Sequence, residues 1–412
     1  MNHLFESKTI INTCKSLIEN KQFIVVNTIL NGLVYNVINV PNIPREMISY
    51  VRKNNNTYII LVESNGNGHI TQMKSIIENL KDTFVCVGII IGREKPLATK
   101  FAKDNQIPIL NLHEPKYVSD QTTDSLVSET LSCIVEYSYY HYTTVTKFIT
   151  SKSPEFIINL HLPIKILSNY TTTVFNISSQ NRLNFDMDEQ NILSENKFDK
   201  FDTLLVQFSS YMINNSHFRA HKIAIDCIDN PNVTTIPPLI KTIHSLSTGT
   251  DKSIVCYFNV EPHISFYSLF SNFPNIVFNV FLENIPSNRE MMYLSDNIHF
   301  YELGNLFQDM RQKCIGVISS CGVESIYENF QLGLPMVCIP SNSEQLFNAY
   351  DHSRKIPGFD YTFELTKKHI EWLINFKKNT FYWKKHKQFK KYLLKDYLLK
   401  DILSVFLIVL NY

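Results

Sequence analysis

The sequence predicts an α/β protein whose chain forms two doubly wound parallel sheets, one after the other. Short apolar runs of strand length alternate with segments of helical periodicity, and this alternation is typical of β-α-β units. It occurs twice, on either side of a polar stretch at residues 241–252. Two such domains are expected to face each other across a cleft at the carboxyl ends of their strands, where open α/β sheets bind ligands.

The composition fits globular domains and excludes several other classes of protein. The 412 residues are long enough for two or three cores, and 44% apolar residues are too many for a disordered chain. The 39 basic and 38 acidic residues nearly balance, whereas binding of a phosphate backbone needs a surplus of Lys and Arg. We therefore expect no nucleic acid as the main partner.

Cysteines and hydropathy indicate a cytoplasmic protein. The eight cysteines are scattered, and none forms the C-x-x-C pair of a zinc or thioredoxin-type site. Most lie within apolar runs, where free thiols are commonly buried, as expected in a reducing compartment. The first residues show no secretory signal, and no apolar stretch reaches the ~20 residues that span a bilayer.

Residues 1–56 are expected to form a small separate extension. Residues 10–18 have helical spacing, and two β-rich runs at 23–30 and 33–40 flank Asn31-Gly32. An Asn-Gly pair favours a type I′ turn because both central residues of that turn need positive φ. The sequence therefore predicts a hairpin, whose expected role is structural or in partner contact because it carries no reactive groups.

Residues 57–240 are expected to form the first Rossmann-like domain. The run Tyr58–Val62 is wholly apolar, as in strands buried inside a parallel sheet. The next helix places its apolar residues on one face, and a long helix is expected over 122–148. The predicted strands are 58–62, 84–91, 107–110, 156–160, 173–177 and 203–206.

Residues 253–362 are expected to form the second domain, after a polar linker at 241–252. Its predicted strands are 254–258, 276–281, 298–301, 316–319 and 336–339. Residues 363–412 form a helical tail in which lysines and aromatic residues interleave ahead of an apolar end. Such a tail suits a helix on an anionic membrane surface, or a last helix that docks back on the first domain, and we favour docking.

The first candidate site is the loop Gly66-Asn-Gly68-His69, between the first strand and its helix. Two glycines let the backbone turn tightly and approach a ligand, and the helix start presents free N–H groups. His69 is a candidate general base near neutral pH. Two plainer interpretations stay open: a dinucleotide turn, although Thr71 replaces its third glycine, and a histidine that only caps the helix.

The second candidate site is the turn Ser320-Cys321-Gly322 between a strand and a helix. Its backbone N–H groups and the helix dipole could hold a diphosphate. Glu328, between one and two helical turns later, is a candidate acceptor for hydrogen bonds from ribose hydroxyls. Glu344 and Gln345 follow the next strand and are candidates for binding sugar hydroxyls. The alternative is an ordinary β-α-β unit with acids on its surface.

These residues resemble parts of the GT-B glycosyltransferases. The segment 316–349 is similar to the donor-binding segment of UDP-glycosyltransferases and of the lipid-linked GlcNAc transferase of peptidoglycan synthesis. The loop at 66–72 resembles the Gly-x-Gly-His loop of the same superfamily. Three further pieces resemble a less characterised bacterial and archaeal branch: residues 153–159 followed by 179–182, residues 237–241 ahead of a strand, and the run Glu-Gln-Leu-Phe-Asn-Ala at 344–349. The resemblance covers about residues 58 to 360, and its motifs are more specific in the second half than in the first.

The resemblance implies two GT-B domains and a hexosyltransferase that uses a nucleotide-diphosphate sugar, expected to be a UDP-sugar. Transfer would be inverting and metal-independent, with no cofactor besides the donor. The first domain would bind the acceptor, a glycan, lipid or small molecule, and His69 would deprotonate its hydroxyl. The donor-binding residues of the second domain would be Ser320, Cys321, Gly322, Glu324, Glu328, Glu344 and Gln345. Membrane contact through the tail would imply a lipid or lipid-linked acceptor.

Two positions depart from the pattern of this branch. Cys321 stands at the first glycine of the phosphate turn, where a larger side chain would narrow the site, and Asn159 replaces an Asp. If that Asp supports catalysis, the chain would be a non-catalytic module that binds a sugar nucleotide or a protein. A sugar-nucleotide epimerase of the same fold is a third hypothesis. Asp120 and Asp124 are candidates, by location, for the carboxylate that orients His69.

Two weaker patterns indicate no site of their own. Asp186-Met-Asp188 is a D-x-D, the metal-diphosphate pattern of the other glycosyltransferase fold, but it is expected in a polar, solvated loop. Cys321 lacks a nearby His or Asn signature that would make it a nucleophile. We therefore expect neither a metal site nor a cysteine nucleophile.

Overall fold

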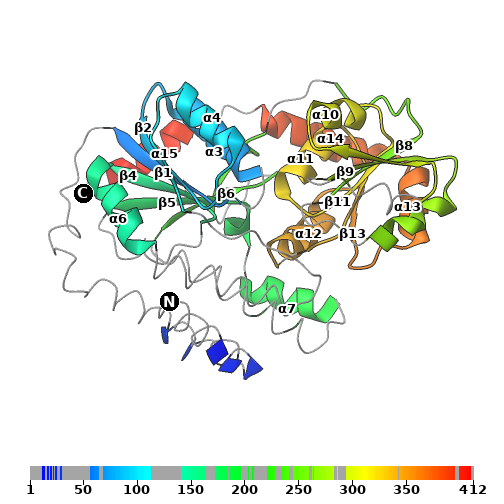
Figure 1. The fold of residues 1–412 in the computed structure, drawn as a ribbon, viewed down its shortest axis with the longest axis horizontal. Coiled ribbons are helices and arrows are strands. Elements are labelled where there is room, and N and C mark those ends of the chain that lie inside the picture. The colour runs from blue at the N-terminus through cyan, green and yellow to red at the C-terminus, as the bar shows by residue number, and fades with distance from the viewer. Residues whose placement is uncertain are drawn as a thin grey trace. The chain divides into compact units, whose positions relative to one another are not determined.

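The computed structural model describes two compact α/β units (Figure 1). The described ranges are 56–64, 68–112, 141–162, 172–183, 185–195, 220–227, 233–240, 245–258, 264–282, 294–341, 343–394 and 399–409. Also described are the short pieces 12–13, 16–17, 19–20, 22, 24–25 and 28–29 and the single residues 203, 207, 262 and 285. The first unit comprises residues 1–239 and 396–412, and the second comprises residues 240–395.

The first unit is built on a seven-stranded parallel sheet of the order β3-β2-β1-β4-β5-β6-β7. Its strands are β1 (Thr57–Val62), β2 (Val85–Ile91), β3 (Ile109–Asn111), β4 (Phe156–Leu160), β5 (Thr173–Ser178), β6 (His221–Ile225) and β7 (Thr234–Ile236). The chain winds outward from β1 to β3 and then in the opposite direction from β4 to β7. The strand order therefore reverses between β1 and β4, the position at which open sheets bind ligands.

Helices cover this sheet with their apolar faces. α3 (Gly68–Leu80) buries residues three and four apart, among them Ile70, Met73 and Ile77. α15 (Leu399–Val409), near the end of the chain, packs against α3 within the same unit. This contact confirms the docking interpretation for the apolar end of the tail. The other described helices of the unit are α4 (Pro96–Asp104), α6 (Tyr142–Lys152), the 3-10 helix η3 (Ser179–Arg182) and α7 (Phe185–Glu195).

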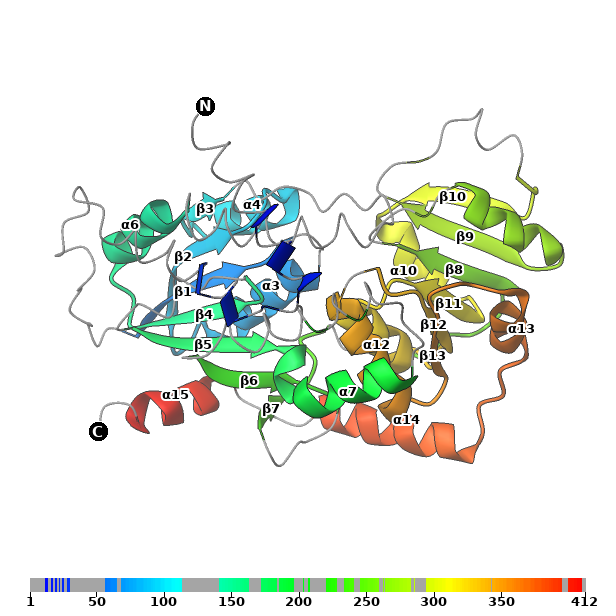
Figure 2. The ribbon, with the colours of Figure 1, turned by 90° about the horizontal axis from the view of Figure 1, so that it is seen from below.

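The second unit repeats the design with a six-stranded parallel sheet of the order β10-β9-β8-β11-β12-β13 (Figure 2). Its strands are β8 (Ser253–Tyr257), β9 (Val277–Leu282), β10 (Ile298–Glu302), β11 (Gly316–Ser319), β12 (Met336–Cys338) and β13 (Phe359–Tyr361). The order reverses between β8 and β11. The described helices are η4 (Ile264–Asn272), α10 (Asn305–Arg311), α11 (Val323–Gln331), α12 (Ser343–Lys355), α13 (Lys367–Asn375) and α14 (Thr380–Leu393).

The Gly333-Leu-Pro335 break ends α11 by a Schellman motif. The N–H of Gly333 donates to the carbonyl of Phe330, and the N–H of Leu334 donates to that of Asn329, each at 2.9 Å. Gly333 has φ +73°, in the left-handed region that favours glycine. The motif turns the chain sharply into β12, which keeps the segment between the two strands short.

The prediction of a hairpin in the N-terminal extension is wrong for its first strand. The described residues at 24, 25, 28 and 29 are helical, whereas the run 23–30 was expected to be a strand. The hydroxyl of Thr28 donates to the carbonyl of Ile24, four residues back, at 2.9 Å. A short apolar run has no period that separates strand from helix, so its β-branched residues misled the prediction. Asn31-Gly32 and residues 33–40 lie outside the described residues.

Three other local predictions need correction or lie partly outside the described residues. Thr203 and Gln207 are helical, although a strand was expected at 203–206. Asp186 and Asp188 belong to the helix α7 and not to a loop. The helix expected at 122–148 is described only from residue 141 onward, as α6. Strands β6, β7 and β13 were not predicted, because three to five residues with polar side chains give too short a pattern.

No helix in the described ranges combines the length and the apolar character needed to cross a bilayer.

Gly333→Ala is expected to destabilise the second unit by about 1–2 kcal/mol, because Ala is strained in the left-handed region. The added Cβ would also lie 3.2 Å from the Leu246 side chain. The matched control is Gly322→Ala, since Gly322 has φ −67° and nothing within 4 Å of an added Cβ. Urea unfolding of both variants measures the difference, and equal stabilities would contradict the assigned role of Gly333.

Candidate functional site

The first cluster of polar groups lies where β1 ends and α3 begins. Nδ1 of His69 lies 2.8 Å from a carboxylate oxygen of Glu63, so the ring donates to that carboxylate through Nδ1. His69 is the second residue of α3 and is 7% exposed, while the N–H of Glu63 donates to the carbonyl of Leu160 on the neighbouring β4. With Nδ1 bound to Glu63, Nε2 is the ring nitrogen that would take up a proton, and the carboxylate would stabilise the imidazolium that forms.

Glu63 is the orienting carboxylate that sequence reasoning did not identify. The candidates named for that role, Asp120 and Asp124, lie outside the described residues. Glu63 is six residues before His69, across the glycine loop. The available signal was its place directly after the strand, because a side chain there and one at the following helix start meet at the same sheet edge. Gly68 begins α3, and Gly66 lies outside the described residues.

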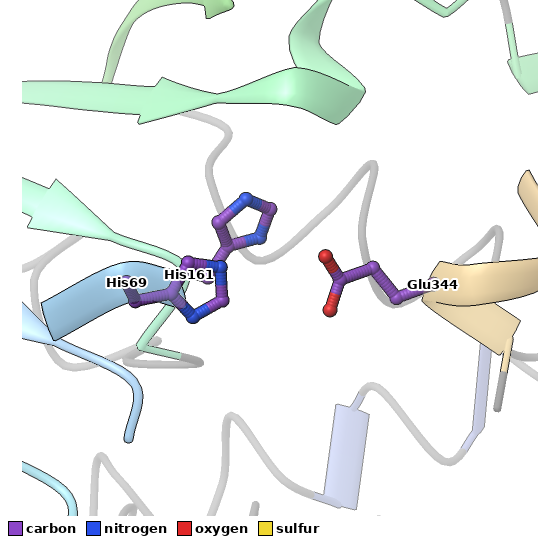
Figure 3. Close-up of side chains that lie close together, drawn as sticks. All are labelled: His69, His161 and Glu344. Carbon is purple, nitrogen blue, oxygen red and sulfur yellow. The ribbon is translucent and has the colours of Figure 1, made fainter. Parts of the chain in front are cut away.

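A second histidine lies against the first. The rings of His69 and His161 stack with centroids 4.6 Å apart and planes inclined by 21° (Figure 3). His161 directly follows β4, so the two histidines come from the two strands between which the strand order reverses. Its backbone has φ +59°, a conformation that a non-glycine residue adopts only when its surroundings hold it there.

Asn159 helps to hold the turn that carries His161. Its Nδ2 donates to the carbonyl of Leu162 at 3.1 Å and contacts Oδ1 of Asn176 at 3.4 Å. The amide of Asn181 continues this buried chain, because it donates to the carbonyls of Asn176 and Ile223. An ionised Asp at position 159 has no donor and could not make the first bond. The amide at position 159, where the branch that the sequence resembles has an Asp, therefore holds the local structure here.

The second cluster lies at the reversal of the second sheet, where β11 leads into α11. The N–H of Ser320 donates to the carbonyl of Tyr257 at 3.1 Å, which ties the turn to the end of β8. Nδ2 of Asn348 on α12 donates to the carbonyl of Cys321 at 3.4 Å. Gly322 is the N-cap residue, and within the described part of the chain the N–H groups of Cys321, Gly322 and Val323 have no protein acceptor.

The Cys321 side chain packs inward, against the Cys338 thiol of β12, and is fully buried. Burial raises the pKa of the Cys321 thiol well above its ordinary value, and the neighbouring thiol adds to the rise. A thiol that stays protonated is a poor nucleophile, which agrees with the prediction that Cys321 is none. Because the side chain points into the core, it does not occupy the space in front of the turn's N–H groups.

Glu328 forms an ion pair with a buried arginine. Its carboxylate accepts from Nη2 of Arg311 at 2.7 Å, and the Arg311 side chain is fully buried. Arg311 also donates to Gln308 at 2.6 Å and to Asn329 at 3.3 Å, and its guanidinium lies 4.7 Å from the Phe307 ring centroid. The sequence marked Glu328 but not Arg311, whose partner lies 17 residues away on another helix. Glu328 therefore has a structural role whatever else it binds.

The remaining predicted residues lie in the first turns of α11 and α12. Glu324 is half-buried in the first turn of α11, and Glu344 is half-buried in the first turn of α12. Gln345 is buried, and its Oε1 accepts from the N–H and the hydroxyl of Ser341, at 2.9 and 2.8 Å. The Asn348 contact joins α12 to the turn at Cys321, so the predicted donor residues gather at one sheet edge of the second unit.

Comparison with known proteins identifies the fold. No family model matches the chain, and no curated protein is similar to it in sequence. Among solved structures, a complex of a UDP-glucosyltransferase from Polygonum tinctorium capable of glucosylating indoxyl aligns with a TM-score of 0.59 at 12% identity, over 86% of this chain and 98% of that one. The chain has the GT-B fold. The match spans both units, as the sequence resemblance predicted.

Two further structures support the GT-B assignment. Phytolacca americana UGT2, complexed with UDP-2fluoro-glucose and pterostilbene, aligns with a TM-score of 0.56 at 11% identity, over 84% of this chain and 99% of that one. The calicheamicin glycosyltransferase CalG4 aligns with a TM-score of 0.53 at 10% identity, over 82% of this chain and 94% of that one. Identities this low establish the fold and leave the reaction to the residues of the site.

Asn159→Asp is expected to destabilise the first unit by about 1–3 kcal/mol, because two acceptors would then face each other at the Leu162 carbonyl. The control is Asn79→Asp, since Nδ2 of Asn79 makes a similar bond to the carbonyl of Ser75 at 2.7 Å on an exposed helix face. Thermal unfolding at neutral pH compares the two variants. A destabilisation no larger than that of Asn79→Asp would show that the amide does not hold the turn.

Proposed function

We propose that this protein is a glycosyltransferase that transfers a hexose from a nucleotide-diphosphate sugar, most simply a UDP-sugar, to an acceptor hydroxyl. The observation that carries the proposal is the Glu63–His69 pair at the strand-order reversal of a GT-B domain. A histidine that a carboxylate orients through one ring nitrogen is the arrangement that a general base needs. The fold supports the same reaction class, because the aligned structures are glycosyltransferases.

In the proposed reaction, Nε2 of His69 takes the proton of the acceptor hydroxyl as its oxygen attacks the anomeric carbon of the donor. The new bond joins the acceptor oxygen to that carbon, and the bond to the diphosphate oxygen breaks with its electron pair. A single displacement inverts the configuration at the anomeric carbon. Glu63 would stabilise the imidazolium while the nucleoside diphosphate leaves.

The proposed diphosphate site is the turn ahead of α11. The N–H groups of Cys321, Gly322 and Val323 and the positive end of the helix dipole would stabilise the charge that builds up on the leaving group. That role needs no metal ion and no cofactor besides the donor. Glu328, fixed in place by Arg311, would accept from ribose hydroxyls, and the half-buried Glu324 and Glu344 are proposed to contact the donor.

The proposed location is the cytoplasm. Six cysteines in the described part of the chain are free thiols, at positions 86, 227, 256, 314, 321 and 338. Free thiols are the usual state in a reducing compartment.

His69→Ala is expected to lower kcat for release of UDP roughly 100-fold to 10,000-fold, the range for loss of a general base. Glu63→Gln keeps an acceptor for Nδ1 but removes the charge, so its kcat should lie between that of His69→Ala and that of the wild type. His299→Ala, an exposed histidine on β10, is the control. The assay screens UDP-sugars against a panel of acceptor hydroxyls and measures UDP.

Three outcomes would contradict this mechanism in different ways. Normal turnover of His69→Ala would remove the proposed base. Conversion of the donor with no acceptor present and no UDP released would indicate an epimerase. Donor binding without transfer to any acceptor would indicate the non-catalytic module.

Glu328→Gln is expected to weaken binding of UDP while leaving the protein folded, because the amide can still accept from Arg311. Glu328→Ala is expected to lower stability by about 3–5 kcal/mol, since it leaves the buried Arg311 charge without its partner. The control is Asp309→Asn, an exposed acid on the same helix as Arg311. The measurement is the rise in melting temperature with UDP concentration, which reports binding to the folded state. An unchanged rise in Glu328→Gln would leave Glu328 with a structural role alone.

A further inference from the structure

The inner face of α14 is fixed by aromatic packing. Tyr382, His386, Phe389 and Tyr392 are buried, and the helix packs against α11 of the same unit. The Phe330 ring of α11 lies 5.9 Å from Tyr382 and 5.1 Å from Phe389, centroid to centroid. The side chain of Asn379 caps the helix by accepting from the N–H of Tyr382 at 2.9 Å. Because this side of α14 is packed against the unit, the opposite side of the helix is the one that is exposed.

That outer face is a lysine stripe, formed by Lys384, Lys387 and Lys391. The three side chains are exposed and lie three and four residues apart, which places them along one side of the helix. α14 contains five lysines and no acidic residue, although the whole chain has a formal charge of only +1. In the ranges that the structure describes, these three lysines form no ion pair. The positive charge is therefore concentrated on one surface of the second unit.

Apolar side chains flank both ends of the stripe. Phe381 and Trp383 in the first turn of α14 are 58% and 38% exposed, and Leu394 just after the helix is 67% exposed. Nζ of Lys378 lies 5.7 Å from the Trp383 ring centroid, and Nζ of Lys385 lies 5.9 Å from that of Phe381. Aromatic rings beside cationic groups are typical of surfaces that lie at the headgroup level of a bilayer.

We propose that the outer face of α14 binds the surface of an anionic lipid bilayer. Anionic headgroups attract lysines that come within a Debye length, and Phe381 and Trp383 would enter the headgroup region beside them. The near-zero net charge of the chain argues against nucleic acid, which draws on a surplus of positive charge. The apolar end of the tail is not the inserting element, because α15 packs against α3. This proposal does not depend on the glycosyltransferase reaction.

The test is sedimentation of the full chain with sucrose-loaded vesicles of 70% phosphatidylcholine and 30% phosphatidylserine. Wild-type protein should bind these vesicles at low salt, bind less at high salt, and not bind pure phosphatidylcholine. Each neutralised lysine is expected to lower the partition coefficient about fivefold, so Lys384→Gln with Lys387→Gln and Lys391→Gln should lower it roughly 100-fold. Phe381→Ser alone should cause a smaller loss. The control changes Lys81, Lys100 and Lys103 to Gln, three exposed lysines of the first unit, and should bind like the wild type.

Three binding results would overturn the proposal. No binding of the wild-type protein to the phosphatidylserine vesicles would do so. Equal losses in the stripe variant and the control variant would show that only net charge matters. Tight binding to a single-stranded RNA oligonucleotide at the same salt, without vesicle binding, would identify the stripe as a nucleic-acid surface. Melting temperatures equal to that of the wild type would show that the variants are folded, as expected for exposed lysines.

Discussion

The parallel order of the strands, with one reversal in each sheet, is the constraint on which the rest of the structure depends. β1 lies between β2 and β4, and its residues from Tyr58 to Val62 are fully buried. Such a strand has no room for reactive polar groups along its length, so they collect after its carboxyl end. Glu63, His69 and His161 all follow β1 or β4, and the turn at Gly322 follows β11. Both clusters therefore lie at the same kind of position, after the carboxyl ends of the strands at the reversal of a sheet.

Polar groups at these positions are fixed by hydrogen bonds within the protein, because burial keeps water from taking the place of their partners. A buried polar group without a partner is costly, and a buried charge without a partner is more so. Arg311 therefore holds Glu328 in one place, just as Glu63 holds His69. The amide chain from Asn159 to Asn181 does the same for the turn after β4. Groups locked in this way are already oriented when a ligand arrives, which is what a site on a rigid scaffold needs.

The parts of the fold that could be predicted from sequence are those with a strong local signal. The apolar run of β1, the helix α3 and the Gly-Leu-Pro break after α11 each carry a period or a turn residue of their own. The contacts between distant residues that complete the two clusters have no such local signal in the sequence. His161 meets His69 only because β1 and β4 are neighbours in the sheet, and Arg311 reaches Glu328 from a different helix. Pairing between distant strands follows from the packing of the whole sheet, which no window of residues contains.

Some strands were not predicted because their own sequence pattern is weak. β13 has only the residues Phe359 to Tyr361, with an Asp at its centre, and β7 is equally short. Both lie at sheet edges, where the pairing of a single neighbour is enough to define a strand. The apolar run at 23–30 has a stronger β composition than either, yet its described residues are helical. Composition favours a strand only where a neighbour is present to pair with it.

The two positions that differ from the branch that the sequence resembles are explained by their local contacts. Cys321 replaces a glycine but turns its side chain into the core, where burial raises the pKa of the thiol and keeps it neutral. Asn159 replaces an Asp and gains a donor that the Leu162 carbonyl accepts. Neither change removes the chemistry proposed for the site, because backbone N–H groups would hold the diphosphate and Glu63 supplies the carboxylate beside His69. A turn that binds a ligand through its backbone N–H groups tolerates a new side chain if that side chain packs into the core and not on the ligand side of the turn.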